Sequence, residues 1–219
     1  MNLAKAFAVP PLLWRLRTTP NRPEELVDLV LSCNVIRPVQ VREELVEFAR
    51  VVSDLKPKLA LEIGTLHGGT LCLLSRLADP GATILSVDLP LGRFGGGYKW
   101  FYVPIFKGFA RFGQKIHLLR ADSHAPETLS VVQKILGSRQ LDLLFIDGDH
   151  SYEGVRHDFE LYHPLVRPGG VIAFHDVAEH AEPTCEVPRF WNEVKQHYRY
   201  TEVIRDRNQG WAGIGLLYV

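Results

Sequence analysis

The sequence predicts an α/β fold: a doubly wound, mostly parallel, Rossmann-like sheet with N-terminal helices and an antiparallel C-terminal edge hairpin. Two observations favour this class. Five short apolar runs with little polar alternation are typical of strands covered on both faces. Helix-like segments separate these runs, as expected for a parallel sheet. Ligands of such sheets bind beyond the carboxyl ends of the strands.

The five predicted strands each end in a polar or acidic cluster. They are LALEIG (59–64), ATILSVDL (82–89), KIHLLRAD (115–122), LDLLFIDGD (141–149) and GGVIAFHDV (169–177). Segments 69–78 and 125–138 favour helices between them, and segment 152–166 predicts a helix whose charges form one solvated face. The last stretch, 200–219, predicts two strands of an antiparallel hairpin around Asn208 to Gly210.

Two helices are predicted before the first strand. In segment 21–34, Asn21 suits an N-cap, Pro23 suits a first turn, and apolar residues recur at helical spacing. Segment 39–55 favours a second helix on the same grounds. We expect residues 1–43 to form an N-terminal arm with helices and residues 44–219 to form one globular unit. For residues 1–20, an irregular arm and a short helix are both open.

Composition narrows the choice of partner. The 25 basic residues equal the 25 acidic residues, which favours a small molecule over nucleic acid or an anionic membrane. No apolar segment approaches the roughly 20 residues of a membrane span, and no cleavage site is evident after the N-terminal run. The three cysteines, odd in number and without CxxC spacing, favour reduced thiols. We expect a soluble, cytoplasmic protein, and a homo-oligomer is left open.

The segment LEIGTLHGGT places three glycines at the first predicted strand-to-helix turn. Gly64, Gly68 and Gly69 would let a ligand approach backbone N–H groups, although any tight turn also favours glycine. A dinucleotide fingerprint requires glycine where Leu66 stands, and a P-loop requires Lys-Ser/Thr after its last glycine, so neither is present. Glu62 disfavours a pyrophosphate and suits a ligand with ammonium and sulfonium charges.

Acidic residues also end the next two predicted strands. Asp88 lies 24 residues after Gly64, and its two oxygens suit both hydroxyls of a ribose. The alternative is a cap for the following turn. At the end of the third strand, Asp122 and Ser123 either meet an adenine or cap a helix with Glu127 nearby.

The stretch FIDGDHSYEG places two aspartates and a histidine at the end of a predicted buried strand, where an unpaired carboxylate is costly. Together with LEIGTLHGGT, SVDL, RADSH, the continuation to RPGGVIAFHDV and the closing GIGLLYV, it resembles class I S-adenosylmethionine-dependent methyltransferases from about Glu44 to Val219. More narrowly, it resembles the bacterial branch related to metal-dependent O-methyltransferases of small molecules, including catechol, caffeoyl-coenzyme A and macrolide-sugar enzymes. This resemblance implies transfer of a methyl group to a hydroxyl of a small molecule, such as a natural-product sugar or phenol.

The resemblance also implies site residues. Contacts to S-adenosylmethionine are implied at Glu62, Gly64, Thr65, Gly68, Thr70, Asp88, Asp122, Ser123 and Asp147. A divalent metal, Mg²⁺ or Mn²⁺, is implied at Asp147, His175 and Asp176, where the catechol and caffeoyl enzymes have Asp-Asn in place of His-Asp. His150 stands where the sugar-modifying relatives carry a basic histidine, which implies catalysis by His150 and Asp147, with Asp149 as an orienting group. The alternative is a turn capped by Asp147 and Asp149.

Residues 94–112 hold eight of the 22 aromatic residues. With Gly95 to Gly97 as a hinge, this segment either folds over donor and acceptor, or packs on the N-terminal helices or a second copy of the chain.

Three other functions are open from the sequence. They are methyl transfer without metal with His150 as the base, a dinucleotide-dependent oxidoreductase, and a silent S-adenosylmethionine binder. Leu66 and Glu62 disfavour the second of these. The retained Asp147, His150 and Asp176 disfavour the third.

Overall fold

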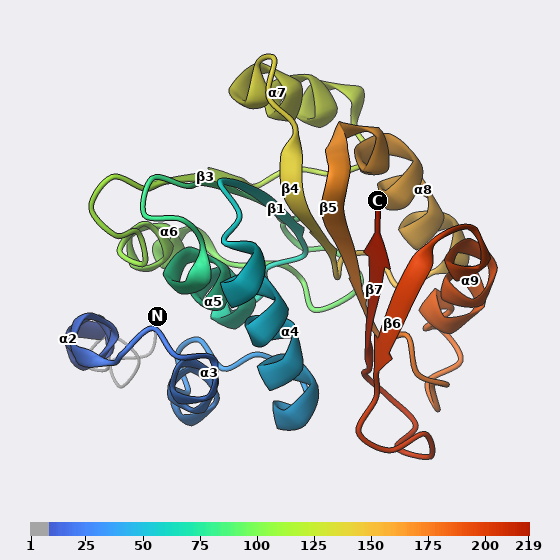
Figure 1. Ribbon diagram of the computed structural model, residues 1–219, viewed down its shortest axis with the longest axis horizontal. Coiled ribbons are helices and arrows are strands. Elements are labelled where there is room, and N and C mark those ends of the chain that lie inside the picture. Colours follow the sequence, from blue (N-terminus) through green and yellow to red (C-terminus); the bar gives the residue numbers. More distant parts are fainter. Residues whose placement is uncertain (1–8) are drawn as a thin grey trace.

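The computed structural model describes residues 9–219 and contains one seven-stranded sheet of order β3-β2-β1-β4-β5-β7-β6 (Figure 1). The strands are β1 (Leu59–Ile63), β2 (Thr83–Val87), β3 (Lys115–Leu119), β4 (Leu141–Ile146), β5 (Val166–His175), β6 (Arg199–Val203) and β7 (Ile214–Tyr218). Neighbours from β3 to β5 pair in parallel, whereas β7 runs antiparallel to both β5 and β6. The predicted fold class, with its antiparallel edge hairpin, is confirmed.

Helices lie on both sides of this sheet. One group comprises α2 (Val9–Thr18), α3 (Pro23–Ser32), α4 (Arg42–Leu55), α5 (Gly69–Leu77) and α6 (Val103–Lys107), and the other α7 (Pro126–Leu136), α8 (Tyr152–Tyr162) and α9 (Val187–Val194). Three short 3₁₀ turns, η1 (Trp100–Tyr102), η2 (His163–Leu165) and η3 (Lys195–His197), complete the described elements. Ala60 packs into the core shared with the first group, whereas Leu59 and Leu61 pack with the second. Both faces of β1 are therefore buried, which explains why its sequence does not alternate.

The N-terminal helices differ from the prediction in how they begin. Arg22 precedes α3 without a side-chain cap, and the Asn21 side chain instead accepts a hydrogen bond from Arg76 Nε at 2.9 Å. The predicted Asn21 cap is wrong because the guanidinium of α5 takes the oxygen that would have capped the helix. α4 begins at Arg42, so Gln40 lies in the loop before it. Within segment 1–20 the short helix α2 is present, and residues 1–8 lie outside the described part of the chain.

The charges of α8 do not all face solvent as predicted. Arg156 pairs with Glu153 at 2.6 Å on the surface, but Asp158 in the same helix is fully buried. Its carboxylate lies 3.2 Å from Nε2 of His124, which follows β3. The prediction of one solvated face fails at this position because a partner from another loop meets the buried carboxylate.

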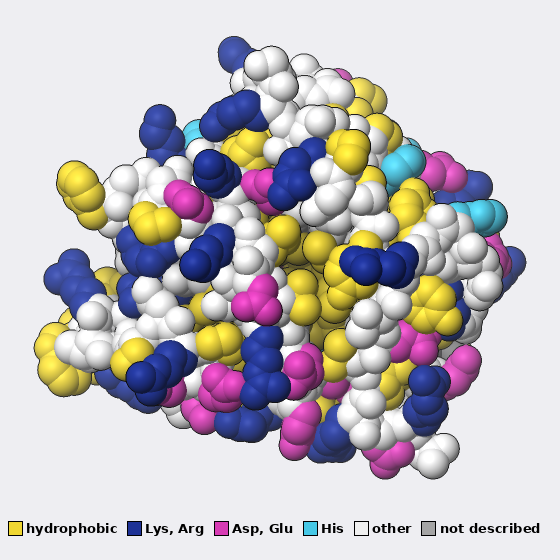
Figure 2. Space-filling model, in the orientation of Figure 1, with side chains coloured by type: hydrophobic (Ala, Val, Ile, Leu, Met, Phe, Trp, Pro, Cys, Tyr) yellow, Lys and Arg dark blue, Asp and Glu magenta, His cyan; other side chains and the backbone are white. Residues whose placement is uncertain are grey.

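The surface carries charges of both signs. Figure 2 shows basic and acidic side chains interspersed around hydrophobic side chains near the middle of this face. Across residues 9–219, every helix is too short or too polar to cross a bilayer.

Candidate active site

A cavity of about 670 Å³ opens where the five parallel strands end. Its lining includes residues that follow each strand, namely Gly64, Asp88, Ala121, Asp147 and Asp176. This volume suits a small-molecule ligand, and the position is the one expected for an open α/β sheet. The topology has therefore gathered polar groups that lie far apart in the sequence.

Gly64 allows the ends of β1 and β4 to meet. Its φ is +85°, and a Cβ at this position would lie 1.8 Å from the carbonyl oxygen of Asp147. The backbone N–H of Asp147 donates to the Ile63 carbonyl at 2.8 Å across the same junction. Gly68 allows a different close contact, because a Cβ added at this position would lie 2.3 Å from the Phe106 ring. Gly64 lines the cavity, whereas Gly68 lies outside the lining.

Asp88 ties two loops together beneath the cavity. One carboxylate oxygen, Oδ2, accepts hydrogen bonds from the backbone N–H groups of Thr65 (3.2 Å), Leu66 (2.7 Å) and Tyr98 (3.3 Å). Asp88 is buried and lines the cavity. Burial raises the pKa of Asp88, although these three donors act in the opposite direction. The Asp88 carboxylate thus fixes both the loop after β1 and the segment that follows Gly95 to Gly97.

Glu62 lies behind the cavity wall. The Thr65 hydroxyl donates to Glu62 Oε2 at 2.7 Å and also lies 2.7 Å from the Ser86 hydroxyl, while Oε1 of Glu62 is buried without a hydrogen-bond partner. Burial raises the pKa of Glu62 well above its usual range, which favours the neutral acid. Thr65 lines the cavity, and Glu62 supports it from behind.

The other residues predicted to contact S-adenosylmethionine also lie on the cavity wall. Thr70, Asp122 and Ser123 all belong to the lining. Asp122 Oδ1 accepts from the backbone N–H of His124 at 2.9 Å, so it caps the turn after β3. The α7 helix begins instead after Ala125, which makes no side-chain cap. Neither Asp122 nor Ser123 caps α7, and that alternative is wrong.

The ends of β4 and β5 bring four titratable side chains together. His175 Nδ1 lies 3.3 Å from an oxygen of Asp147 and 3.3 Å from an oxygen of Asp176. His150 lies on the same carboxylates, with Nε2 3.6 Å from Asp147 and Nδ1 3.5 Å from Asp176. The pairing of Ile146 with Phe174 in the sheet sets this arrangement, because the next residue of each strand then faces the other. Asp176 has a left-handed φ of 60°, which a non-glycine residue adopts only when its surroundings hold it.

The charges of this cluster stabilise one another. Burial raises the pKa of a carboxyl group, but His175 outweighs it at Asp147 and Asp176, and the pKa of each falls below its usual value. Burial also lowers the pKa of an imidazole, yet these two carboxylates raise the pKa of His175 well above its usual value and raise that of His150 as well. Two adjacent negative charges, of which that of Asp176 is buried, therefore favour a positive partner here, either an imidazolium or a bound cation.

This cluster has the composition of a metal site. The donor atoms of Asp147, His175 and Asp176 lie within 4.8 Å of one another, and all three residues line the cavity. Nε2 of His175 is buried without a hydrogen-bond partner. Two carboxylates and an imidazole fit a divalent ion, and the imidazole shifts the preference toward transition metals.

Asp149 has a separate structural role. Its Oδ1 accepts hydrogen bonds from the backbone N–H of Ser151 (2.9 Å) and from the Ser151 hydroxyl (2.7 Å). Ser151 in turn caps α8 by accepting from the backbone N–H of Gly154 at 3.2 Å. Asp149 thus shapes the turn that presents His150, while Asp147 points to the cluster.

The aromatic segment divides between cavity and core. Phe94 lines the cavity and stacks on the His150 ring, with ring centroids 4.9 Å apart. Four other aromatics are buried in the core of the N-terminal helices: Tyr98, Tyr102, Phe106 and Phe109. The predicted packing on the N-terminal helices is therefore present, while closure of the segment over bound ligands stays a prediction.

Gln40 is a site residue that the sequence did not reveal. Its side-chain amide nitrogen lies 3.5 Å from Asp147 Oδ2 and 3.3 Å from the Thr70 hydroxyl, and Oε1 is buried without a partner. Gln40 is 107 residues from Asp147 in the chain. Only the packing of the loop before α4 against the carboxyl end of the central strand β4 brings the two together.

The strand order and the cavity at the carboxyl ends of the strands define the methyltransferase class of α/β proteins. A family model described as a methyltransferase domain matches residues 61–177, more than half of the chain, and the chain belongs to this family. Two uncharacterised proteins are similar in sequence: R132 of Acanthamoeba polyphaga mimivirus (29% identity over 55% of this chain) and y4gI of Sinorhizobium fredii (27% over 66%). The matches span 52% of R132 and 16% of y4gI.

Solved methyltransferase structures share the fold. An O-methyltransferase from Bacillus cereus, in complex with S-adenosylhomocysteine, matches 91% of this chain and 91% of its own, with a TM-score of 0.60 and 17% identity. TomG from Streptomyces achromogenes, in complex with S-adenosylmethionine, matches 79% and 78% (TM-score 0.57, 18%). CalS11, a TDP-rhamnose 3′-O-methyltransferase of calicheamicin biosynthesis, matches 100% and 95% (TM-score 0.59, 20%).

Proposed function

We propose that this protein transfers the methyl group of S-adenosylmethionine to a hydroxyl of a small molecule, assisted by a divalent metal. One observation carries the proposal: His175 Nδ1 lies 3.3 Å from both Asp147 and Asp176 on the wall of a ligand-sized cavity, beside His150. Family membership and the fold of solved O-methyltransferases support the reaction class.

The β1 and β2 ends of the cavity suit the methyl donor. Asp88 keeps Oδ1 outside the three hydrogen bonds that its Oδ2 accepts, so Oδ1 remains for a ribose hydroxyl. Gly64, Thr65 and Thr70 line the adjoining wall, and Asp122 and Ser123 line the side after β3, where an adenine would lie. We assign these residues to the donor, with Glu62 supporting Thr65 rather than contacting the ligand.

The β4 and β5 ends suit the chemical step. Asp147, His175 and Asp176 would hold a divalent ion, which supplies positive charge that favours ionisation of an acceptor hydroxyl. His150 would take the proton of that hydroxyl as the oxygen attacks the methyl carbon. The bond between sulfur and the methyl carbon then breaks, S-adenosylhomocysteine leaves, and His150 returns its proton to solvent. Phe94 covers one face of His150 and limits access of water to it.

A hydroxylated sugar or phenol is the acceptor class that we infer. The CalS11 similarity supports a sugar, because that protein modifies a TDP-linked rhamnose. Arg93, which lies 5.5 Å from the Phe94 ring and lines the cavity, offers a positive charge for a phosphate-linked acceptor.

Methyl transfer without metal is the second candidate. Its specific support is that Asp147 and Asp176 raise the pKa of His175 well above its usual value, so an imidazolium at this position offsets one of the two negative charges without a cation. In that case His150 alone would act on the hydroxyl.

A screen of acceptor molecules, carried out with and without added metal, tests the proposal. Protein stripped with EDTA would be given S-adenosylmethionine and a panel of phenols, glycosides and nucleotide sugars, with and without Mg²⁺ or Mn²⁺, and formation of S-adenosylhomocysteine would be measured. The proposal predicts turnover that EDTA abolishes and added metal restores. EDTA-resistant turnover would select the metal-free candidate, and preferential binding of NAD over S-adenosylmethionine in calorimetry would reject both.

A further inference from the structure

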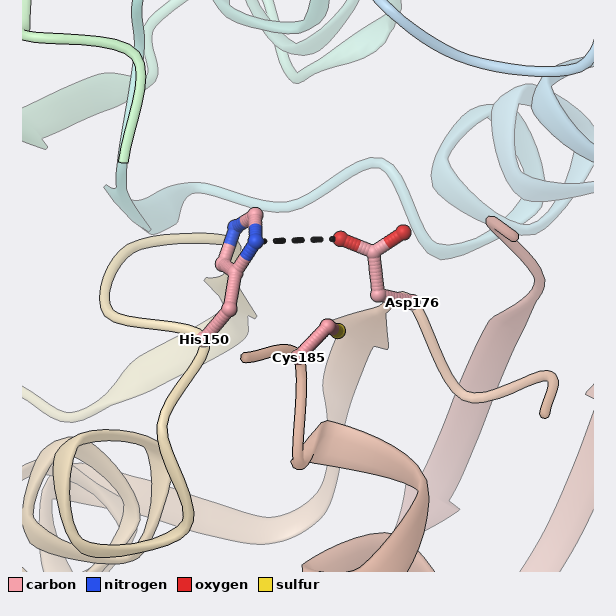
Figure 3. A group of neighbouring side chains, drawn as sticks. All are labelled: His150, Asp176 and Cys185. Carbon is pink, nitrogen blue, oxygen red and sulfur yellow. Dashed lines mark ion pairs between the residues drawn. The ribbon is translucent and has the colours of Figure 1, made fainter. Parts of the chain in front are cut away.

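A second group of metal-ligating side chains adjoins the first and shares Asp176. It consists of His150, Asp176 and Cys185, whose ligand atoms lie within 4.8 Å of one another. Figure 3 shows the three side chains converging from three segments: the loop after β4, the end of β5 and the loop before α9. The two groups use different oxygens of Asp176, because Oδ1 faces His175 and Oδ2 faces His150 Nδ1 at 3.5 Å.

The backbone holds Cys185 against His150. The N–H of Glu186, the next residue, donates to the His150 carbonyl at 2.7 Å, and the N–H of Cys185 donates to the Glu182 carbonyl at 3.1 Å. Asp176 is fixed from the other side, since its Oδ1 accepts from the backbone N–H of Ala212 at 3.1 Å. Hydrogen bonds that do not depend on a bound ion therefore fix the backbone at His150 and Cys185 and the side chain of Asp176.

The environment of Cys185 differs from that of the other cysteines. Cys72 is packed in the apolar core of the N-terminal helices, and Cys33 packs at the edge of that core. Cys185 is buried beside an imidazole and a carboxylate that line the cavity, those of His150 and Asp176, and lies behind them. A thiolate, an imidazole and a carboxylate make up a three-ligand set of the kind found in protein zinc sites.

We propose that His150, Asp176 and Cys185 form a second cation site for a thiophilic ion such as Zn²⁺, whose occupation withdraws His150 from proton transfer. The ion displaces the thiol proton of Cys185 and takes the Nδ1 lone pair of His150. Mg²⁺ and Mn²⁺ prefer oxygen ligands and leave this site to softer ions. Inhibition by the ion rests on the proposed function, because it requires His150 to be the base, whereas ion binding does not.

Cobalt spectroscopy tests the site without any activity. Co²⁺ added to the reduced full-length protein should give a near-ultraviolet charge-transfer band of a cobalt–thiolate bond. Both Cys185→Ser and Cys185→Ala should remove this band. Two variants are used so that the test still holds if one of them does not fold. Cys33→Ser is the matched control and should keep the band. Absence of the band in the wild-type protein, or its survival in a folded Cys185 variant, would overturn the proposal.

Zinc titration tests selectivity and inhibition. By calorimetry, the Cys185 variants should bind Zn²⁺ about 10- to 100-fold more weakly at this site, while their Mn²⁺ affinity stays that of the wild type. In the Mn²⁺-loaded enzyme, Zn²⁺ should inhibit the wild type at about tenfold lower concentration than it inhibits the variants. Equal sensitivity would overturn the inhibitory role. If no acceptor is ever methylated, the proposed function fails, while the cobalt band still decides whether the site exists.

Discussion

The two sides of the cavity contain acidic side chains whose pKa values are shifted in opposite directions. At the β1 and β2 ends, Glu62 and Asp88 meet hydroxyls and backbone N–H groups, and burial raises the pKa of each. At the β4 and β5 ends, Asp147 and Asp176 meet imidazoles, which lower their pKa values in spite of burial. The carboxyl end of the sheet thus offers hydrogen-bonded carboxyl groups on one side and carboxylates paired with imidazoles on the other.

This difference indicates a division of labour. A ribose hydroxyl needs a hydrogen-bond acceptor such as a carboxylate oxygen, whereas proton removal needs a base and positive charge that stabilises a developing anion. The partners of a carboxylate, rather than its presence at a strand end, decide which task it suits. Changes that exchange or remove those partners should therefore affect one side of the cavity more than the other.

Replacing His150 should give the largest effect. We expect His150→Gln to lower kcat by roughly 10² to 10⁴, the usual contribution of a positioned base, while donor affinity is retained. Wild-type activity should fall as the pH drops and the His150 imidazole becomes protonated, and the variant should lose this limb. A pH series of kcat/KM tests both points. His197→Gln, an exposed change in η3, is the control, and full activity of His150→Gln at every pH would reject the base assignment.

Gly64 lies where the end of β1 meets the end of β4, and a methyl group at this position should disturb both sides of the cavity. Because the added Cβ would lie 1.8 Å from the Asp147 carbonyl oxygen, Gly64→Ala should destabilise the fold by about 3 kcal/mol or more in urea denaturation. Gly137→Ala is the matched control, because Gly137 also has a positive φ but no neighbour within 4 Å of an added Cβ. Equal losses in the two variants would show that backbone strain alone, and not the junction of β1 with β4, explains the effect.

The His124–Asp158 pair should respond to pH in a defined direction. The bond to buried Asp158 raises the pKa of His124, so its stabilisation is complete below the unfolded value near 6.5 and is lost as the pH rises through the folded value. His124→Gln should therefore cost about 1 to 3 kcal/mol of unfolding free energy at pH 6 and less at pH 8. His157→Gln, which removes a ring stacked on His124 but keeps the ion pair, serves for comparison. A cost for His124→Gln that is the same at both pH values would contradict the pairing.

The smallest expected effect concerns Phe94. Loss of its ring from the face of His150 removes about 0.5 to 1.5 kcal/mol of stacking, and Phe94→Ala should lower kcat by roughly 2- to 12-fold with little change in donor affinity. Phe112→Ala, at a fully exposed ring of the same segment, should change neither. Unchanged turnover in Phe94→Ala would assign the whole segment to packing.

Much of the site was predictable because parallel strands gather their carboxyl ends. Asp147, His175 and Asp176 lie on adjacent strands, so a correct strand order alone places them together. The contributions of Gln40, Asp158 and Cys185 were not predictable in this way. Each depends on how a loop or helix packs against a distant segment, and such contacts leave no local pattern in the sequence.

The direction in which the pKa of each acidic residue is shifted also could not be predicted from the sequence. Glu62 and Asp147 both end apolar strands, and their patterns are alike. Thr65 and Ser86 surround the first carboxylate, whereas His175 and His150 surround the second, and only the three-dimensional arrangement assigns these partners.

A paired calorimetric titration tests the division between the two sides most directly. Wild type, Asp88→Ala and Asp176→Asn would each be titrated with S-adenosylmethionine and, separately, with Mn²⁺. Asp88→Ala should weaken donor binding by about 1.5 to 3 kcal/mol and leave Mn²⁺ binding intact. Asp176→Asn should weaken Mn²⁺ binding by more than about tenfold and leave donor binding intact. If either substitution weakened both ligands equally, or if the wild type bound neither, the assignment of the two sides would be contradicted.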